Sequence, residues 1–340
     1  MVVCKQTVLR SRPVEIVAAS HFEVKTVEVS DALNPGQLFI QTLYLSMDPA
    51  VRLYISERKT YWAQVPIGGV MPAIGVGRVL KSASEKYQTG DVIRGMLTTS
   101  EYLVLHEKDV WAKVPSKVNP VSELGVFGVH GLTARVGLVD FGKVTPRSTV
   151  LVSVAAGATG SAAVQVARAI GCRVVGIVGR EWKREYVLRQ LGAASCINYS
   201  TTPDLVSALK EACPSGVDCY FDLAGGPFLE AALEVMNPEG RVVLCGAISG
   251  YDRSTELPVR NFGLIAKKRL QAQGYIIAAF PQYYKEAIKD LYRWKREGKL
   301  VSREQLLPGI ESVTEALPLL YRGDNIGKVI IEVQPNSPKL

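Results

Sequence analysis

The chain has 340 residues, of which 47% are hydrophobic and 21% are charged. At roughly 150 residues per domain this length predicts about two domains, whose cores need no disulfide or metal to fold. The composition excludes disorder as the dominant state. No apolar run reaches the roughly 18 residues of a transmembrane helix, and residues 1–12 lack the apolar stretch of a secretory signal. We therefore expect no membrane partner.

Lys and Arg together number 40 and Asp and Glu number 32, which gives a formal net charge of +8. A positive balance can attract nucleic acid or phosphorylated ligands. The basic residues are scattered, however, and even the dense cluster Arg180–Arg184 is too short for a nucleic-acid-binding tail. We expect a basic enzyme with a small-molecule substrate and no nucleic-acid partner.

The cysteines and histidines lack the spacing of metal ligands. None of the six cysteines forms a Cys-x-x-Cys pair, and none of His21, His106 and His130 is spaced with a cysteine as metal ligands are. Several cysteines lie in apolar runs, where a free thiol behaves as a small hydrophobic side chain; this suits a reducing, cytoplasmic location. The sequence therefore predicts no metal site.

The first 120 residues read as short strands separated by Gly and Pro. Examples are Gln37–Leu45, Gly75–Leu80 and Glu101–Leu105. Short alternating strands with turn signals predict a compact, mostly antiparallel β domain. A helical stretch over Val121–Leu138 is expected to link this domain to the next.

From Thr149 onward, continuous apolar runs alternate with helical patterns such as Ser161–Ile170 and Pro281–Glu297. The runs are Val150–Val154, Arg173–Val178, Ser195–Tyr199, Val217–Leu223, Arg241–Gly246 and Gln271–Ile277. Such runs indicate strands buried on both faces, hence a parallel sheet covered by helices. Six strands in this order predict an α/β, doubly wound Rossmann domain.

The last strand-like run, Gly327–Val333, fits the first domain better than the second. We therefore predict a first domain over residues 1–120, a dinucleotide-binding domain over residues 121–305, and a return to the first domain over residues 306–340.

A glycine motif follows the first strand of the second domain. It reads Ala155-Ala156-Gly157-Ala158-Thr159-Gly160, which is the dinucleotide fingerprint with Ala at its first glycine position. Gly157 would let the backbone approach a pyrophosphate, and Gly160 would let helix and strand pack closely. The helix N-terminus then offers free N–H groups to the phosphates. The plainer alternative is a glycine-rich turn without a ligand.

The end of the second strand bears on the choice of dinucleotide. NAD enzymes place an acidic residue there, whereas this strand ends in Gly179 and Arg180, with Lys183 close behind. Basic side chains attract a 2′-phosphate, so we predict NADP(H) as the cofactor. The alternative is a solvated basic helix start, which Glu181 would make more ordinary.

With no metal site and no motif for acyl or phosphoryl transfer, the remaining chemistry is hydride transfer from a nicotinamide. The substrate must then react without a Lewis acid. An activated carbon–carbon double bond is such a substrate, because hydrogen bonds can hold the enolate that develops.

The sequence resembles the zinc-independent medium-chain dehydrogenase/reductases, most closely the group of prostaglandin, alkenal and curcumin reductases. The motifs that carry the resemblance are Leu43–Pro49, Gly131–Ala134, Ala155–Gly160, Asn198-Tyr199, Tyr220–Asp222, Cys245–Tyr251 and Gly323–Lys328. The resemblance implies a GroES-like β domain joined to a Rossmann domain, a homodimer, and NADPH-dependent reduction of the α,β double bond of enones and enals.

The same resemblance implies site residues. It places the phosphate loop on Gly157, Ala158, Thr159 and Gly160, and the 2′-phosphate contacts on Lys183 and Tyr199. It places the nicotinamide half of the cofactor along Cys245, Gly246, Ala247, Ile248 and Tyr251, along Tyr275, Ile276 and Ile277, and at Asn325. More ordinary roles are a strand aromatic for Tyr199 and a turn residue for Asn325.

An enolate oxygen needs a hydrogen-bond donor, and two tyrosines are candidates. Tyr251 closes the cofactor-lining segment, and Tyr61 resembles a substrate-side tyrosine of some members, although its segment also reads as a surface loop. A phenol donates a hydrogen bond while staying neutral. We expect Cys245 to serve packing rather than to act as a nucleophile.

The chain departs from the family pattern at Leu223, Ala50, His130 and Arg135. We expect these changes to alter the shape and polarity of the substrate pocket more than the reaction type. For His130, a structural role and a pH-sensitive donor in the cleft both stay open. Two alternative functions also stay open, an NADPH quinone reductase and a weakly catalytic NADP-binding regulatory protein.

Overall fold

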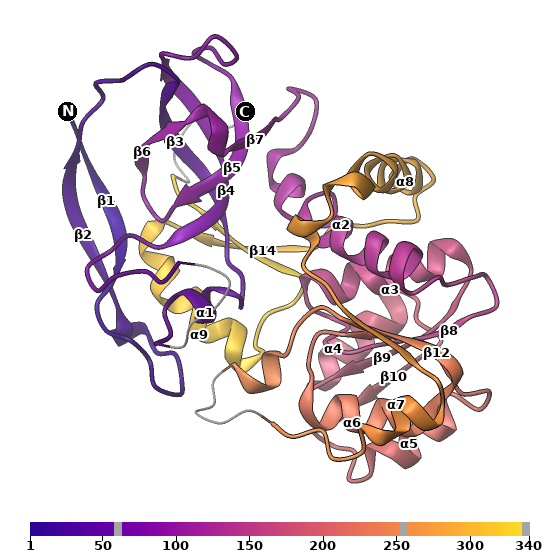
Figure 1. Cartoon of the computed structure of the whole chain (residues 1–340). Coiled ribbons are helices and arrows are strands. Elements are labelled where there is room, and N and C mark those ends of the chain that lie inside the picture. The colour runs from indigo at the N-terminus through magenta and orange to yellow at the C-terminus, as the bar shows by residue number, and fades with distance from the viewer. Residues whose placement is uncertain (58–62, 252–256, 335–340) are drawn as a thin grey trace. The chain divides into compact units, whose positions relative to one another are not determined.

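A computed structural model describes residues 1–57, 63–251 and 257–334. The described chain forms two compact units, traced by residue number in Figure 1. One contains residues 1–124 and 304–334, and the other contains residues 125–251 and 257–303. No helix among the described residues is long and apolar enough to cross a membrane.

In the described part of the second unit, six strands form one sheet in which every neighbouring pair is parallel. The strands are β8 (Thr149–Val152), β9 (Arg173–Val178), β10 (Ser195–Asn198), β11 (Val217–Asp222), β12 (Met236–Leu244) and β13 (Gln271–Gly274). Their order is β10-β9-β8-β11-β12-β13, so the chain runs outward from β8 and then crosses back to β11. This is the doubly wound order, and the predicted Rossmann fold is confirmed.

Helices cover both faces of this sheet (Figure 1). They are α2 (Val129–Val136), α3 (Ala158–Ile170), α4 (Glu181–Glu185), α5 (Leu205–Ala212), α6 (Gly226–Val235), α7 (Gly263–Lys267) and α8 (Tyr284–Arg296). Figure 1 shows α2, α3 and α8 on one side and α5, α6 and α7 on the other. The double cover explains why β8 is buried at every position and β9 at every position after Arg173.

The first unit is mostly antiparallel. Its strands are β1 (Val2–Leu9), β2 (Phe22–Val29), β3 (Gln37–Ser46), β4 (Pro72–Ser82), β5 (Val92–Thr98), β6 (Tyr102–His106), β7 (Val110–Lys113), β14 (Glu304–Pro308) and β15 (Lys328–Glu332). Its helices are α1 (Val51–Tyr54) and α9 (Val313–Arg322). Strand β15 lies antiparallel to β3, with Ile330 opposite Ser46, so the C-terminal segment completes the N-terminal sheet.

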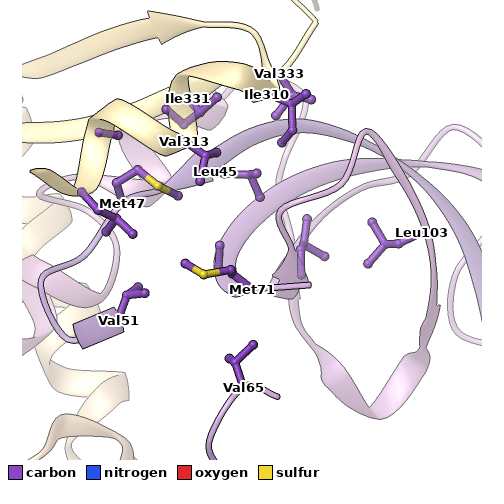
Figure 2. Close-up of a cluster of buried hydrophobic side chains, with 14 of the residues drawn as sticks. Leu45, Met47, Val51, Val65, Met71, Leu103, Ile310, Val313, Ile331 and Val333 are labelled. Atoms are coloured by element: carbon purple, nitrogen blue, oxygen red, sulfur yellow. The ribbon is translucent and has the colours of Figure 1, made fainter. Parts of the chain in front are cut away.

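An apolar core joins the early and late segments of this unit. Figure 2 shows Leu45 and Met47 of the N-terminal part close to Val313 and Ile331 of the C-terminal part. All four side chains are at most 2% exposed. Burial of such side chains contributes about 1.5–3 kcal/mol each, so this shared core holds the two segments in one unit.

A buried ion pair also ties two of the sequence motifs together. The Lys328 ammonium donates to the Met47 carbonyl at 2.6 Å and to Asp48 Oδ1 at 2.7 Å. Burial lowers the pKa of Lys328, and the Asp48 carboxylate opposes that shift. The motifs Leu43–Pro49 and Gly323–Lys328, far apart in sequence, therefore meet in one polar contact.

Several predicted elements differ in extent from the observed ones; the strand expected over Gln271–Ile277, for example, ends at Gly274. The expected helix over Val121–Leu138 is a 3-10 helix (Pro120–Leu124), a turn that includes Gly125 and Gly128, α2, and a π-helical segment that starts at Gly137. The glycines of the turn weaken helix continuity. The expected strand Val150–Val154 ends at Val152, because Val154 takes a left-handed conformation with φ +51°.

Candidate functional site

The glycine motif forms the turn between β8 and α3. The turn is closed by Gly157, whose N–H donates to the Val154 carbonyl at 2.9 Å and whose carbonyl accepts from Ser161 at 2.8 Å. A Cβ at Gly160 would lie 2.1 Å from the Val154 carbonyl oxygen. Any side chain at Gly160 would therefore push the helix away from the strand, which is the role its motif position predicts.

Gly157 faces a different environment. A Cβ there would meet atoms of Val154 at 3.2 and 3.3 Å, and, its two chain neighbours aside, no other atom of the described chain within 4 Å. The first N–H groups of an α-helix have no partner within the helix, and they point out of its N-terminus. The segment from Gly157 to Gly160 thus presents backbone donors beside space that a side chain would fill, an arrangement suited to a phosphate.

Two departures from the family pattern lie on α2, and both have a structural explanation. His130 Nδ1 lies 2.9 Å from the hydroxyl of Thr159, in the first turn of α3. Arg135 points toward α8, where its Nε and Nη2 donate to Asp290 at 2.9 and 2.8 Å. Within its unit, the guanidinium thus joins two helices, a contact that the sequence alone did not indicate.

At the end of β9, Gly179 lies under the ring of Tyr199. A Cβ at Gly179 would be 2.6 Å from the Tyr199 hydroxyl oxygen. The Tyr199 ring packs edge-on against Phe228 with centroids 4.8 Å apart, yet 44% of the residue is exposed. The ring is therefore held in place while its surface stays open to a ligand.

Acidic and basic side chains at the end of β9 lie in different surroundings. The Glu181 carboxylate accepts from Arg184 at 2.8 Å and from Asn198 at 3.3 Å, and these contacts lower the pKa of Glu181. Lys183 is buried, with its ammonium 5.3 Å from the centre of the Trp182 ring. The buried stem of Lys183 argues against a fully solvated helix start.

The ends of β11 and β12 are joined by backbone hydrogen bonds. The N–H groups of Cys245 and Gly246 donate to the Asp222 carbonyl at 2.8 and 3.3 Å. The Tyr251 hydroxyl would lie 3.5 Å from a Cβ placed on Gly246. Tyr251 therefore reaches back over the strand end that the resemblance assigns to the nicotinamide half.

Burial raises the pKa of Cys245 well above its usual value. Because the thiolate is the nucleophilic form, this environment fits the packing role expected for Cys245. The Tyr275 hydroxyl, which donates to the Thr133 carbonyl, also contacts this thiol. The ring of Tyr275 packs 5.1 Å from Phe141.

The Tyr275 side chain is therefore poorly accessible to a ligand. Tyr275 is 5% exposed and Ile277 is 7% exposed, whereas Ile276 is 43% exposed. Of these three side chains, only that of Ile276 is free to face a cofactor. For Tyr275 and Ile277 the predicted contact would have to come from the backbone.

Asp222 is a site residue that the sequence reasoning missed. It is fully buried, and its Oδ1 accepts from the Ser153 hydroxyl at 3.1 Å, from the Tyr220 hydroxyl at 2.8 Å and from the N–H groups of Ala224 and Gly225 at 2.9 and 3.0 Å. Burial raises the pKa of Asp222, against the effect of these donors. The Asp222 carboxyl thus links the end of β11 to Ser153, which follows β8 and precedes the phosphate loop. Its sequence signal was an acid at the end of an apolar run.

Two predicted site residues are not part of this arrangement. Tyr61 lies outside the described residues. Asn325 belongs to the other unit, where it is buried and donates to the Gly327 carbonyl at 3.3 Å. Asn325 thus shapes the turn before β15, and its cofactor role stays a prediction.

No group of three or more His, Cys, Asp or Glu residues in the described chain could hold a metal ion. The histidine rings make other contacts: His21 with the Ala18 backbone, His106 with the Lys108 N–H, and His130 with Thr159.

The doubly wound sheet, the glycine turn at its first strand and the separate β unit together define a two-domain, dinucleotide-dependent oxidoreductase.

Comparison with known proteins agrees with that class. Residues 5–113 match a family model described as the N-terminal domain of oxidoreductase, and residues 158–293 match one described as zinc-binding dehydrogenase. The chain belongs to the medium-chain dehydrogenase/reductase family, whose first domain is GroES-like.

Individual relatives match nearly the whole chain. Prostaglandin reductase 1 of Bos taurus is 36% identical over 98% of this chain and 100% of its own length. The NADPH-dependent curcumin reductase of Escherichia coli strain K12 is 33% identical over 97% of this chain and 96% of its own. The crystal structure of CurA from Vibrio vulnificus in complex with NADPH is 31% identical, covers 97% of this chain and 99% of its own, and has a TM-score of 0.91.

Proposed function

We propose that this protein uses NADPH to reduce the α,β carbon–carbon double bond of enones and enals, without a metal. A hydride is added at the β-carbon and a proton at the α-carbon. The observation that carries the proposal is the position of Tyr251, whose hydroxyl reaches Gly246 at the end of β12. Dinucleotides bind at this edge of doubly wound sheets, and the full-length relatives named above reduce prostaglandins and curcumin according to their names.

The residues of the glycine turn fit the cofactor's phosphates. Ala158, Thr159 and Gly160 offer helix N-terminal donors to the pyrophosphate, and Gly157 leaves room for it to approach the backbone. Gly179, Arg180, Lys183 and Tyr199 receive the 2′-phosphate, since the nearby Glu181 is paired with Arg184 and Asn198. The segments Cys245–Ile248 and Tyr275–Ile277, with Tyr251, line the nicotinamide half, and the family resemblance also assigns Asn325 to the cofactor.

Bound NADPH supplies the hydride. The chain's own part is to orient the substrate and to stabilise the charge that develops on its carbonyl oxygen. The Tyr251 hydroxyl donates a hydrogen bond to that oxygen, and Tyr61 is the second candidate donor. A donor held in place before the reaction stabilises the enolate at no cost of reorganisation. An enolate held in this way needs no Lewis acid, so turnover should survive a chelator.

The test is reduction of a panel containing an enone, an enal, a quinone and the saturated ketone that matches the enone. We expect loss of NADPH absorbance with the enone and enal and none with the saturated ketone. Deuterium from C4-labelled NADPH should appear at the β-carbon. Tyr251→Phe should lower kcat by about 100- to 1,000-fold, which is the usual cost of losing one oxyanion donor.

Other outcomes separate the alternatives. Turnover of the quinone alone would favour a quinone reductase. NADPH binding without turnover of any acceptor would favour a regulatory protein. With NADH in place of NADPH, Lys183→Ala should change the KM little, whereas with NADPH it should raise the KM about tenfold, because NADH lacks the 2′-phosphate.

We also propose a cytoplasmic homodimer. All six cysteines are free thiols, which suits a reducing compartment. The dimer rests on the family resemblance. Light scattering should then give about twice the 37.0 kDa of one chain. A mass of one chain at micromolar concentration would contradict it.

A further inference from the structure

We propose that His130 is a positioning residue for the cofactor's pyrophosphate. Its Nδ1 holds the hydroxyl of Thr159 so that the hydroxyl proton points outward, to a phosphate oxygen. The proposal rests on the proposed phosphate loop Gly157–Gly160, and it adds a residue from another helix that the dinucleotide motif does not contain.

The contact joins two helices that pack together. His130 is the second residue of α2, is 8% exposed, and lies 2.9 Å through Nδ1 from Thr159 Oγ1. Thr159 is the second residue of α3 and lies between Gly157 and Gly160. Thr159 is only partly buried, and its hydroxyl contacts the imidazole.

The chemistry of a hydroxyl makes this contact directional. A threonine hydroxyl has one proton to donate and two lone pairs to accept with. Among the described residues, the Thr159 hydroxyl has the His130 imidazole as its hydrogen-bond partner. When Nδ1 carries the ring proton, Nδ1 donates to Oγ1 and the hydroxyl proton stays available. When Nδ1 lacks a proton, the hydroxyl donates to the ring and has none left for a ligand.

A phosphate selects between these two arrangements, because its oxygens only accept hydrogen bonds at neutral pH. Donation from a hydroxyl to a charged oxygen is about twice as strong as a neutral hydrogen bond. Binding of the pyrophosphate therefore favours the tautomer or protonation state with a proton on Nδ1. His130 thus sets the direction of the Thr159 hydroxyl without touching the cofactor.

The test compares two replacements of the histidine. Asparagine places an amide donor close to the position of Nδ1, whereas leucine fills similar volume without a donor. We expect His130→Leu to weaken NADPH binding roughly tenfold in Kd, the effect of one hydrogen bond to a charged group. His130→Asn should stay within about threefold of the unaltered chain. The loss should appear in Kd and KM much more than in kcat.

Thr159 completes a double-mutant cycle. Thr159→Val should cost at least as much as His130→Leu, and the double variant should cost little more than Thr159→Val alone, because His130 acts only through the Thr159 hydroxyl. Thr159→Ser keeps the hydroxyl and is the matched control. The effect should be equal for NADH and NADPH, since both carry the pyrophosphate, whereas Lys183→Ala should act on NADPH alone.

Several outcomes would overturn the proposal. They are independent costs of the two substitutions, equal losses for asparagine and leucine, or a lower melting temperature with unchanged Kd. If Lys183→Ala weakens NADPH binding and His130→Leu does not, the cofactor site stands and the role of His130 falls. If the unaltered chain does not bind NADPH, the proposed function falls with it.

Discussion

Gly157 and Gly160 lie three residues apart in the same turn but have different neighbours. A Cβ at Gly160 would overlap the Val154 carbonyl oxygen at 2.1 Å, whereas one at Gly157 would have its nearest neighbours at 3.2 and 3.3 Å. Gly157 also has φ −78° and ψ 176°, a conformation that alanine adopts without strain. The second glycine therefore serves the fold, whereas the first is accounted for by the phosphate site that we propose.

This difference predicts opposite outcomes for two alanine variants. Gly160→Ala should lower the free energy of unfolding by about 1–3 kcal/mol, as overpacking does. Gly157→Ala should leave the melting temperature of the cofactor-free protein unchanged or slightly higher, yet weaken NADPH binding. Thermal melts and titrations of both variants check this. An unaltered melting temperature for Gly160→Ala would show that the turn can relax around a side chain.

Among helices, one guanidinium joins α2 to α8. Arg135 is 7% exposed, contacts Asp290 through two nitrogens and contacts Asp140 through a third. Removing one member of a buried ion pair leaves charge without compensation.

We therefore expect Arg135→Leu to lower the free energy of unfolding by about 1–3 kcal/mol, because Asp290 keeps its ion pair with Arg293. Arg135→Lys should recover only part of this, because an ammonium cannot reach both carboxylates as a planar fork does. Urea unfolding measures both changes. Asp290→Asn combined with Arg135→Leu is the control, and should cost less than the sum of the two. A change below about 0.5 kcal/mol for Arg135→Leu would contradict a role in stability.

For the whole molecule, the thiols link stability to pH. Burial raises the pKa of Cys172 and Cys213 to about 11 and of Cys196 and Cys219 to about 12, from the ordinary thiol value of 9.0. Above pH 9 the unfolded chain therefore loses these protons before the native chain does. Because the native state then binds more protons, stability falls as the pH rises through this window.

The prediction is a urea midpoint that is level near pH 8 and declines above pH 9. Cys219→Ala should make the decline shallower, because one buried thiol no longer titrates. At pH 8 a thiol reagent should react slowly with the native chain. After unfolding, the reagent should react with all six cysteines. Fast reaction of several native thiols would contradict the burial on which this prediction depends.

Much of the fold was predictable, because its signals are local. The apolar runs from Val150 onward identified all six parallel strands, and the predicted strand Arg173–Val178 agrees with β9 at both ends. The errors lie at boundaries. Val154 continues an apolar run but turns into the left-handed region, and only the path of the chain into α3 requires that conformation.

The candidate site divides in the same way. The motif Ala155–Gly160 could be recognised because its residues are adjacent in sequence. Three contacts of the site each join separate elements. They are the packing of Tyr199 on Gly179, the hydrogen bond of Ser153 to Asp222 and the hydrogen bond between His130 and Thr159. No pattern within a single element contains such a contact.

The sequence by itself determined the class of this protein: a parallel sheet, a dinucleotide turn at its first strand, and basic residues where an NAD enzyme has an acid. Periodicity and motif spacing are properties of neighbouring residues, so they can be read without a structure. Only the tertiary structure decided that Arg135 joins two helices, that the Tyr275 side chain is buried, and that Lys328 pairs with Asp48. These outcomes depend on which distant elements pack together, because a side chain's direction and its partner are set by that packing.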